Sequence, residues 1–83
     1  MVGYRQACRI AARSLDLAGW VRNRADGTVE VWAQGDDAAL DDFIPSLWRG
    51  SAAAQVLGVE SEMVAPDTTL RDFFIMPDER LRP

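Results

Sequence analysis

The sequence has no histidine and a single cysteine, Cys8, among its 83 residues. Without histidine, the chain cannot hold a histidine-based catalytic triad or a histidine general acid, and most zinc sites are excluded as well. One cysteine cannot form a disulfide within the chain. A lone cysteine in a helical pattern is most often a small buried apolar residue, so we interpret Cys8 as a core residue. The chemistry of the protein must therefore come from other side chains.

Positive charge and long apolar runs are also scarce. Thirteen acidic residues against nine basic ones give a net charge of −4, which disfavours a nucleic-acid partner because such surfaces need clustered positive charge. No segment is long and apolar enough to span a membrane, and residues 1–14 lack the apolar stretch of a secretory signal. These absences predict a cytoplasmic protein without membrane or nucleic-acid partners. At this length we expect one domain, residues 1–83.

Residues 4–16 carry the pattern of an amphipathic helix. The apolar stripe of this helix is made of Tyr4, Cys8, Ala11 and Leu15. Two strand-like runs follow at residues 20–24 and 28–34, and the Asp26-Gly27 pair between them is a strong hairpin signal. In the second run, alternate apolar positions predict that one face of the strand packs under helices.

A second helix is predicted further along the chain. Asp36 or Asp37 can cap its start, and Gly50 ends it. Its apolar stripe contains Leu40, Phe43, Ile44, Leu47 and Trp48. Because an interior proline removes a backbone hydrogen bond and clashes with the preceding turn, Pro45 predicts a kink or break near residues 41–44.

Two weaker strand patterns, at residues 54–64 and 70–76, precede a polar end at 78–83 that we expect to be frayed. The resulting order is helix, strand, strand, helix, strand, strand. It predicts an α+β sandwich, with two helices on one face of an antiparallel sheet. In the ferredoxin-like, split βαβ version of this layout, a strand precedes the first helix and lies in the middle of the sheet. We expect that first, central strand to be missing here.

Arg5 stands in the first helical turn, just after Gly3. A cation gains nothing from the helix dipole at this end, whereas a phosphate or another oxyanion would explain both the arginine and the glycine. The helix rises about 18 Å and the strand after it returns about 20 Å, so Asn23 ends near the level of Arg5. An asparagine amide can orient a water molecule. The residues alone allow either a pair that hydrolyses a phosphorylated compound or a solvated arginine and a turn asparagine.

The sequence resembles the acylphosphatase family over nearly its whole length. The run VGYR at residues 2–5 resembles the end of the family's first signature, roughly G-x-V-Q-G-V-G-[FY]-R. The run GWVRNRADGTVEVWAQG at residues 19–35 resembles the second, G-[FW]-V-x-N-x-x-D-G-x-V-E with a glycine shortly after. Further along, LDDFIPSLWRG and FFI resemble the family's second helix and last strand. The second signature is long and specific, so it carries most of the resemblance.

The resemblance implies a hydrolase that cleaves acyl phosphates to a carboxylate and inorganic phosphate without a metal or cofactor. Arg5 matches the arginine that binds the phosphate, and Asn23 matches the asparagine that positions the attacking water, so these are the expected catalytic residues. Val2, Gly3 and Tyr4 are expected to bind substrate together with Arg5, through backbone N–H groups of the loop. Inorganic phosphate is then the product and an expected inhibitor. The carboxylate leaving group is already stabilised, so no strong acid is required.

The chain departs from the family at its front, where Met1 stands in place of a glycine and half of the phosphate loop is missing together with the preceding strand. Such a gap weakens the phosphate cradle and leaves strand edges unpaired. Three explanations are open: truncation of a longer active protein, self-association by strand exchange, and a folded remnant without catalysis. We expect little activity from the 83-residue form. The alternative function is a non-catalytic α+β module that binds an anion or a protein.

Overall fold

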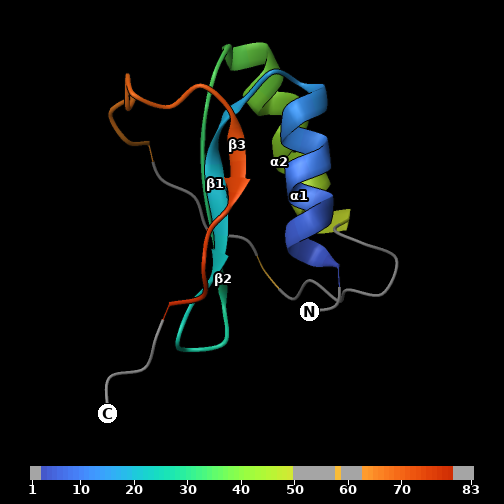
Figure 1. Ribbon diagram of the computed structural model, residues 1–83. Helices are drawn as coiled ribbons and strands as arrows, with labels where there is room; N and C mark the ends of the chain where they lie inside the picture. Colours follow the sequence, from blue (N-terminus) through green and yellow to red (C-terminus); the bar gives the residue numbers. More distant parts are fainter. Residues whose placement is uncertain (1–2, 50–57, 59–62, 80–83) are drawn as a thin grey trace.

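The described part of the chain contains two helices and three strands, and Figure 1 shows their arrangement. The computed structural model describes residues 3–49, 58 and 63–79. In chain order the elements are α1 (Tyr4–Ser14), β1 (Ala18–Asn23), β2 (Val29–Gln34), α2 (Asp37–Arg49) and β3 (Phe73–Ile75). They confirm the predicted helices, the hairpin and a short last strand. The other expected strand, at 54–64, lies mostly outside the described residues.

Helix α1 packs through residues that are spaced four positions apart. Tyr4, Cys8 and Ala12 are buried, while Ala11 and Leu15 are partly buried beside them. The expected stripe is therefore on the correct face of the helix. The most buried line of that face passes through Ala12 rather than Ala11, because residues four apart lie on one helix face. The interpretation of Cys8 as a core residue is confirmed, since this side chain is 2% exposed.

Strands β1 and β2 form the predicted hairpin. Asn23 pairs with Val29 at the end of the antiparallel ladder, and the Arg24 N–H donates to the Thr28 carbonyl at 2.7 Å. In the turn, Oδ1 of Asp26 accepts hydrogen bonds from the backbone N–H and the hydroxyl of Thr28, at 3.0 and 2.6 Å. Asp26 thus closes the turn locally, as aspartate does in turns of this kind.

The sheet is mixed, so the expectation of an antiparallel sheet is wrong for its last strand. The strand order is β2-β1-β3, and β3 runs parallel to β1, with Gly19 opposite Phe73 and Val21 opposite Ile75. Parallel neighbours need a crossover connection, usually through a helix. The chain between β2 and β3 contains α2, which allows β3 to enter the sheet in the direction of β1.

Helix α2 continues through Pro45, so the expected break near residues 41–44 is absent. The helix extends from Asp37 to Arg49. Pro45 and Asp41 are both exposed, and solvent can therefore reach the Asp41 carbonyl, which has no proline N–H to accept. Of the predicted apolar stripe, Phe43 is buried, Leu40 and Leu47 are partly buried, and Ile44 and Trp48 are exposed.

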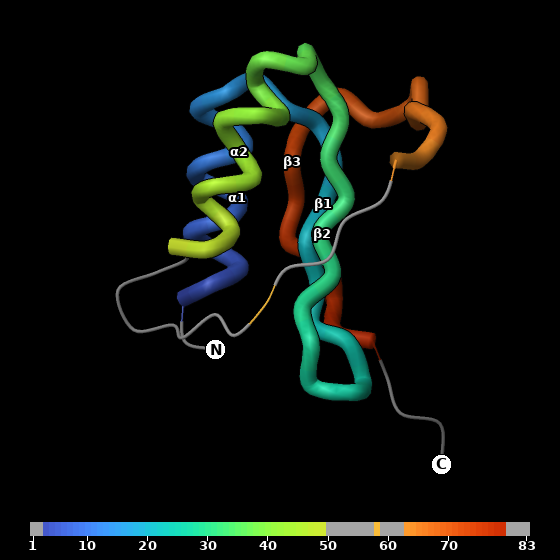
Figure 2. Tube along the Cα trace, turned by 180° about the vertical axis from the view of Figure 1, so that it is seen from behind, coloured from blue at the N-terminus to red at the C-terminus, as the bar shows by residue number. Residues whose placement is uncertain are grey.

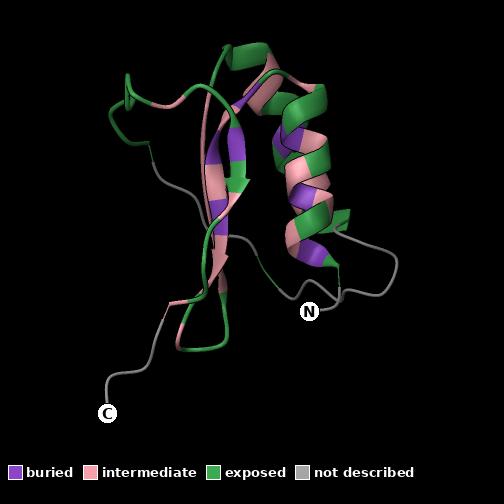
Figure 3. Ribbon diagram, viewed as in Figure 1, coloured by how far each residue is buried: buried purple, intermediate pink, exposed green. Residues whose placement is uncertain are grey.

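The hydrophobic core lies between both helices and one face of the sheet (Figures 2 and 3). The Phe43 and Phe73 rings meet edge to face, with centroids 6.0 Å apart, and so join α2 to β3. The buried residues are Tyr4, Cys8, Ala12, Leu17, Val21, Phe43 and Phe73. Because Tyr4 belongs to this core, the first turn of α1 is fixed relative to the sheet.

Candidate active site

Helix α1 begins at a backbone conformation that favours glycine. Gly3 is the N-cap residue and has a φ of 72°, in the left-handed region. Within the described residues, no side chain caps this helix start, and its first turn contains no acidic residue. The N–H groups of the first turn and the positive end of the helix dipole therefore favour an anionic ligand at this position.

Arg5 shares a cavity with this glycine. Gly3, Arg5, Gln6 and Ile75 line a space of about 160 Å³ between the start of α1 and the end of β3. The Arg5 side chain is 35% exposed, and its Nη1 donates to Oδ1 of Asp78 at 3.0 Å. A guanidinium has five N–H donors in a fixed fork. Arg5 can therefore hold a second anionic group besides the Asp78 carboxylate.

Tyr4 and Val2 were the other residues expected at the phosphate. The Tyr4 side chain is buried, and its hydroxyl donates to the Leu47 carbonyl of α2 at 2.6 Å. Burial raises the pKa of Tyr4 to about 12, and the neighbouring Cys8 adds to the shift. The side chain therefore anchors the helix start and leaves only its backbone N–H for a ligand. Val2 lies outside the described residues.

The Cys8 thiol lies next to Tyr4 in the core. Burial raises its pKa to about 11, and a hydrogen bond with Tyr4 partly opposes that shift. The thiol thus remains protonated near neutral pH, and a protonated, buried thiol is a poor nucleophile. Cys8 is a packing residue rather than a reactive group.

Asn23 is the last residue of β1 and is half-buried. Val29 of β2 pairs with it on one side. On the other side, its carbonyl accepts a hydrogen bond from the Glu79 N–H at 2.8 Å. Since Asp78 contacts Arg5 and Glu79 contacts Asn23, two consecutive residues connect the two predicted catalytic positions. Arg5 and Asn23 therefore lie toward the same end of the sheet.

Sequence reasoning missed the roles of Asp78 and Glu79, which were expected to be part of a frayed end. Oε1 of Glu79 accepts a hydrogen bond from the Ala25 N–H at 2.9 Å, and its Oε2 lies 3.5 Å from Nη2 of Arg22. These contacts join segments more than fifty positions apart in the chain. No local pattern signals them, because they depend on the path of the chain after β3.

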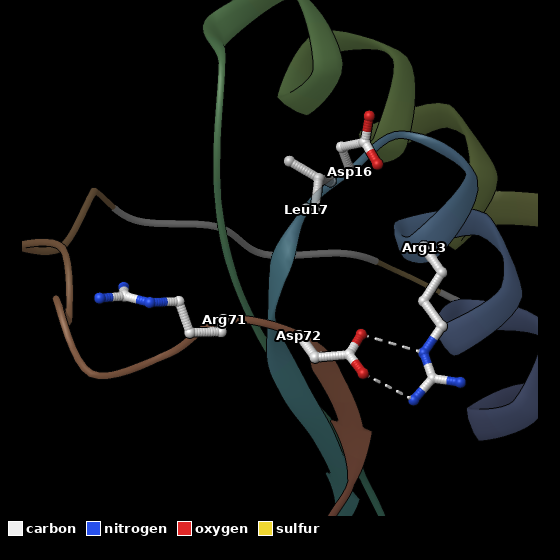
Figure 4. Close-up of a pocket in the computed structure, with 5 residues that line it drawn as sticks. All are labelled: Arg13, Asp16, Leu17, Arg71 and Asp72. Atoms are coloured by element: carbon white, nitrogen blue, oxygen red, sulfur yellow. Dashed lines mark hydrogen bonds and ion pairs between the residues drawn. The ribbon is translucent and has the colours of Figure 1, made fainter.

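A larger cavity, of about 430 Å³, lies beside the C-terminal end of α1 (Figure 4). Three of its charged residues have partners: Nε of Arg13 lies 3.2 Å from Oδ1 of Asp72, and Nη1 of Arg71 donates to the Thr68 carbonyl at 2.8 Å. In Figure 4 the Arg71 side chain points away from the Arg13–Asp72 pair. The cavity is at the opposite end of α1 from Gly3 and Arg5, so it is separate from the candidate site.

The described residues contain neither a metal-binding cluster nor a membrane-spanning helix. Among residues 3–49, 58 and 63–79, no three histidine, cysteine, aspartate or glutamate side chains gather closely enough to hold a metal ion. In the same part of the chain, neither helix has the length and apolar character needed to cross a bilayer.

Comparison with known proteins identifies one family. The acylphosphatase family model matches residues 1–75. An acylphosphatase of Koribacter versatilis is 50% identical over 74 residues, which cover 89% of this chain and 67% of the relative. One of Rhizobium etli is 45% identical over 74 residues, covering 89% and 79%. The crystal structure of acylphosphatase from Bacillus subtilis superposes with a TM-score of 0.85 at 33% identity, covering 90% of this chain and 83% of that one. An acylphosphatase structure from Coxiella burnetii has a TM-score of 0.79 at 34% identity, covering 90% and 78%.

Proposed function

Because this chain belongs to the acylphosphatase family, whose members are metal-independent hydrolases, we propose that it hydrolyses acyl phosphates to a carboxylate and inorganic phosphate. The observation that carries the proposal is the shared cavity of Gly3 and Arg5 at the start of α1. A left-handed glycine, a helix N-terminus and an arginine together form a positively polarised cradle, which suits a phosphoryl group.

In the proposed reaction, Arg5 and the backbone N–H groups around Gly3 and Tyr4 hold the phosphoryl oxygens. Negative charge spreads over the equatorial oxygens in the transition state, and fixed donors stabilise that charge without reorganising. The Tyr4 hydroxyl bond to Leu47 supports this role, because it fixes the first turn of α1 against α2. Val2 is proposed to belong to the same substrate-binding loop.

Asn23 is proposed to orient the attacking water through its side-chain amide. The amide offers both a donor and an acceptor, so it can fix a water molecule in one orientation. The carboxylate leaves as a stabilised anion, and hydrolysis then depends on positioning and on electrostatic stabilisation rather than on a general acid. The half-buried position of Asn23 at the end of β1 supports this role.

We also propose the ferredoxin-like, split βαβ arrangement for the complete sheet. The two helices on one face and the β1–β2 hairpin support it, as does the similarity to solved acylphosphatases. The missing first strand and self-association by strand exchange stay predictions, and so does the low activity expected of the 83-residue form.

Hydrolysis of benzoyl phosphate tests the proposed function. We expect low but measurable turnover by the folded 83-residue chain, and we expect Arg5→Ala to lower kcat/KM by at least about 100-fold, because the main phosphoryl contact is lost. Arg9→Ala is the matched control: Arg9 lies one turn further along α1, contacts Gln6 and should change kcat/KM by less than about twofold.

Two outcomes would contradict this assignment. Full activity of Arg5→Ala would show that Arg5 does not hold the phosphoryl group. A folded chain that binds inorganic phosphate through Arg5 without any turnover would instead support the alternative, a non-catalytic anion-binding module. If the chain is instead a protein-binding module, the surface around Trp48, which is exposed on α2, would be the first candidate for the partner's binding site.

A further inference from the structure

We propose that Glu79 is a positioning residue for the reaction, because it holds the backbone at Asn23 and just after it. The inference rests on the proposed role of Asn23 in orienting water. Glu79 makes contacts with three residues of the hairpin, namely Arg22, Asn23 and Ala25. Asn23 carries the amide that is proposed to orient the reacting water, and Arg22 and Ala25 lie next to it in the chain.

The backbone of Glu79 extends the sheet beyond the end of β3. Strand β3 ends at Ile75, opposite Val21 of β1, and the Met76 N–H donates to the Val21 carbonyl at 2.8 Å. The Glu79 N–H then donates to the Asn23 carbonyl, two residues further along β1. Asn23 is therefore held from both sides, by Val29 of β2 and by Glu79.

The Glu79 carboxylate fixes the chain just after Asn23. Its Oε1 accepts the Ala25 N–H at 2.9 Å, where the hairpin has already left the ladder. The neighbouring turn residues Arg24, Asp26 and Gly27 are exposed, so little packing holds the turn in place. A hydrogen bond from a backbone N–H to a charged acceptor is stronger than a neutral one. Loss of the carboxylate would remove a long-range restraint on the backbone that follows Asn23, which the hydrogen bonds within the turn do not replace.

The contact of Glu79 with Arg22 holds the hairpin less firmly than its hydrogen bond with the Ala25 N–H. Arg22 is already held by Glu30, through bonds of 2.9 Å from Nε and 2.8 Å from Nη2 to Oε1, and its guanidinium lies 5.4 Å from the centroid of the Trp20 ring. The distance from Arg22 to Oε2 of Glu79 is longer, at 3.5 Å. A glutamine at position 79 would keep an acceptor for the Ala25 N–H and lose only this weaker ion pair.

The position of Glu79 separates its effect from phosphate binding. Arg5, the proposed phosphate ligand, contacts Asp78, and within the described residues it makes no hydrogen bond or ion pair with Glu79. Release of the hairpin end would therefore displace the Asn23 amide while leaving the Arg5 cradle in place. Small displacements of positioning groups lower turnover strongly.

The test compares Glu79→Ala, Glu79→Gln and the unmodified chain in benzoyl phosphate hydrolysis, with inorganic phosphate as the competing inhibitor. We expect Glu79→Ala to lower kcat about tenfold, because the water-orienting amide is displaced, and to leave the phosphate inhibition constant within about twofold. Glu79→Gln should keep kcat within about twofold of the unmodified chain, since the Ala25 N–H retains its acceptor. Hydrogen exchange of the Ala25 amide should accelerate in Glu79→Ala only.

Asp72→Ala is the matched control. Asp72 forms an ion pair with Arg13 at the other end of α1, so a loss of kcat in this variant would indicate general destabilisation. The inference is overturned if Glu79→Ala weakens kcat and phosphate inhibition equally, if it changes neither, or if Glu79→Gln is as impaired as Glu79→Ala. Absence of hydrolysis by the unmodified chain would count against the proposed function, whereas the outcomes above count against the role of Glu79, so the two failures are distinct.

Discussion

At the scale of single residues, Arg5 faces two anionic groups that compete for it. The Asp78 carboxylate pairs with its guanidinium at 3.0 Å in the structure, and the proposed substrate brings a phosphoryl group to the same side chain. The Asp78 side chain is 61% exposed, and ion pairs of that exposure contribute little stability. Phosphate can therefore displace or share this contact at small cost.

Removal of the Asp78 charge should strengthen phosphate binding. We expect Asp78→Asn to lower the phosphate inhibition constant by about two- to fivefold, because the guanidinium loses a competing anion and the phosphate loses a repulsive neighbour. Inhibition of benzoyl phosphate hydrolysis by inorganic phosphate measures the change. Weaker inhibition in the variant would show that Asp78 instead holds Arg5 in its binding orientation.

At the scale of elements, local sequence patterns correctly predicted the hairpin and the first helix, whose formation depends on neighbouring residues. The Asp26-Gly27 turn and the strand-like runs on either side of it predicted the hairpin, and the apolar stripe of Tyr4, Cys8, Ala11 and Leu15 predicted α1. The direction of β3 was predicted wrongly, because it depends on the crossover through α2 rather than on the residues of the strand. The break predicted at Pro45 was also wrong, because that prediction depended on where the proline lies in the fold. Pro45 is exposed in α2, so solvent can satisfy the carbonyl that loses its hydrogen bond.

The hairpin depends on close approach of its two strands at Gly19. A Cβ at this position would lie 1.8 Å from the Trp32 carbonyl oxygen, and the φ of 148° already favours glycine. We expect Gly19→Ala to destabilise the fold by more than about 3 kcal/mol in urea unfolding, because backbone atoms must move apart.

Gly27→Ala serves as the control within the same hairpin. A Cβ there meets no atom within 4 Å, so the expected cost is only about 1 kcal/mol, from its positive φ. Equal losses in the two variants would contradict the close packing of β1 and β2 at Gly19.

At the scale of the whole molecule, the candidate site forms because the chain leaves along α1 and returns along β1. That path could be predicted from element lengths alone, and it placed Arg5 and Asn23 toward one end. The residues that connect them, Asp78 and Glu79, could not be predicted, because the segment after β3 carries no pattern that indicates its tertiary partners. The same path separates the site from the larger cavity at the other end of α1.

The most direct test of the account is the effect of Asn23→Ala on turnover and on phosphate binding. Turnover is measured as kcat for benzoyl phosphate, and phosphate binding is measured as the inhibition constant of inorganic phosphate. The account predicts that kcat falls by about 100-fold, because the attacking water loses its orientation, while phosphate inhibition stays within about twofold because Arg5 and the start of α1 are untouched. An equal loss of kcat and of phosphate affinity would contradict the division of roles between Arg5 and Asn23.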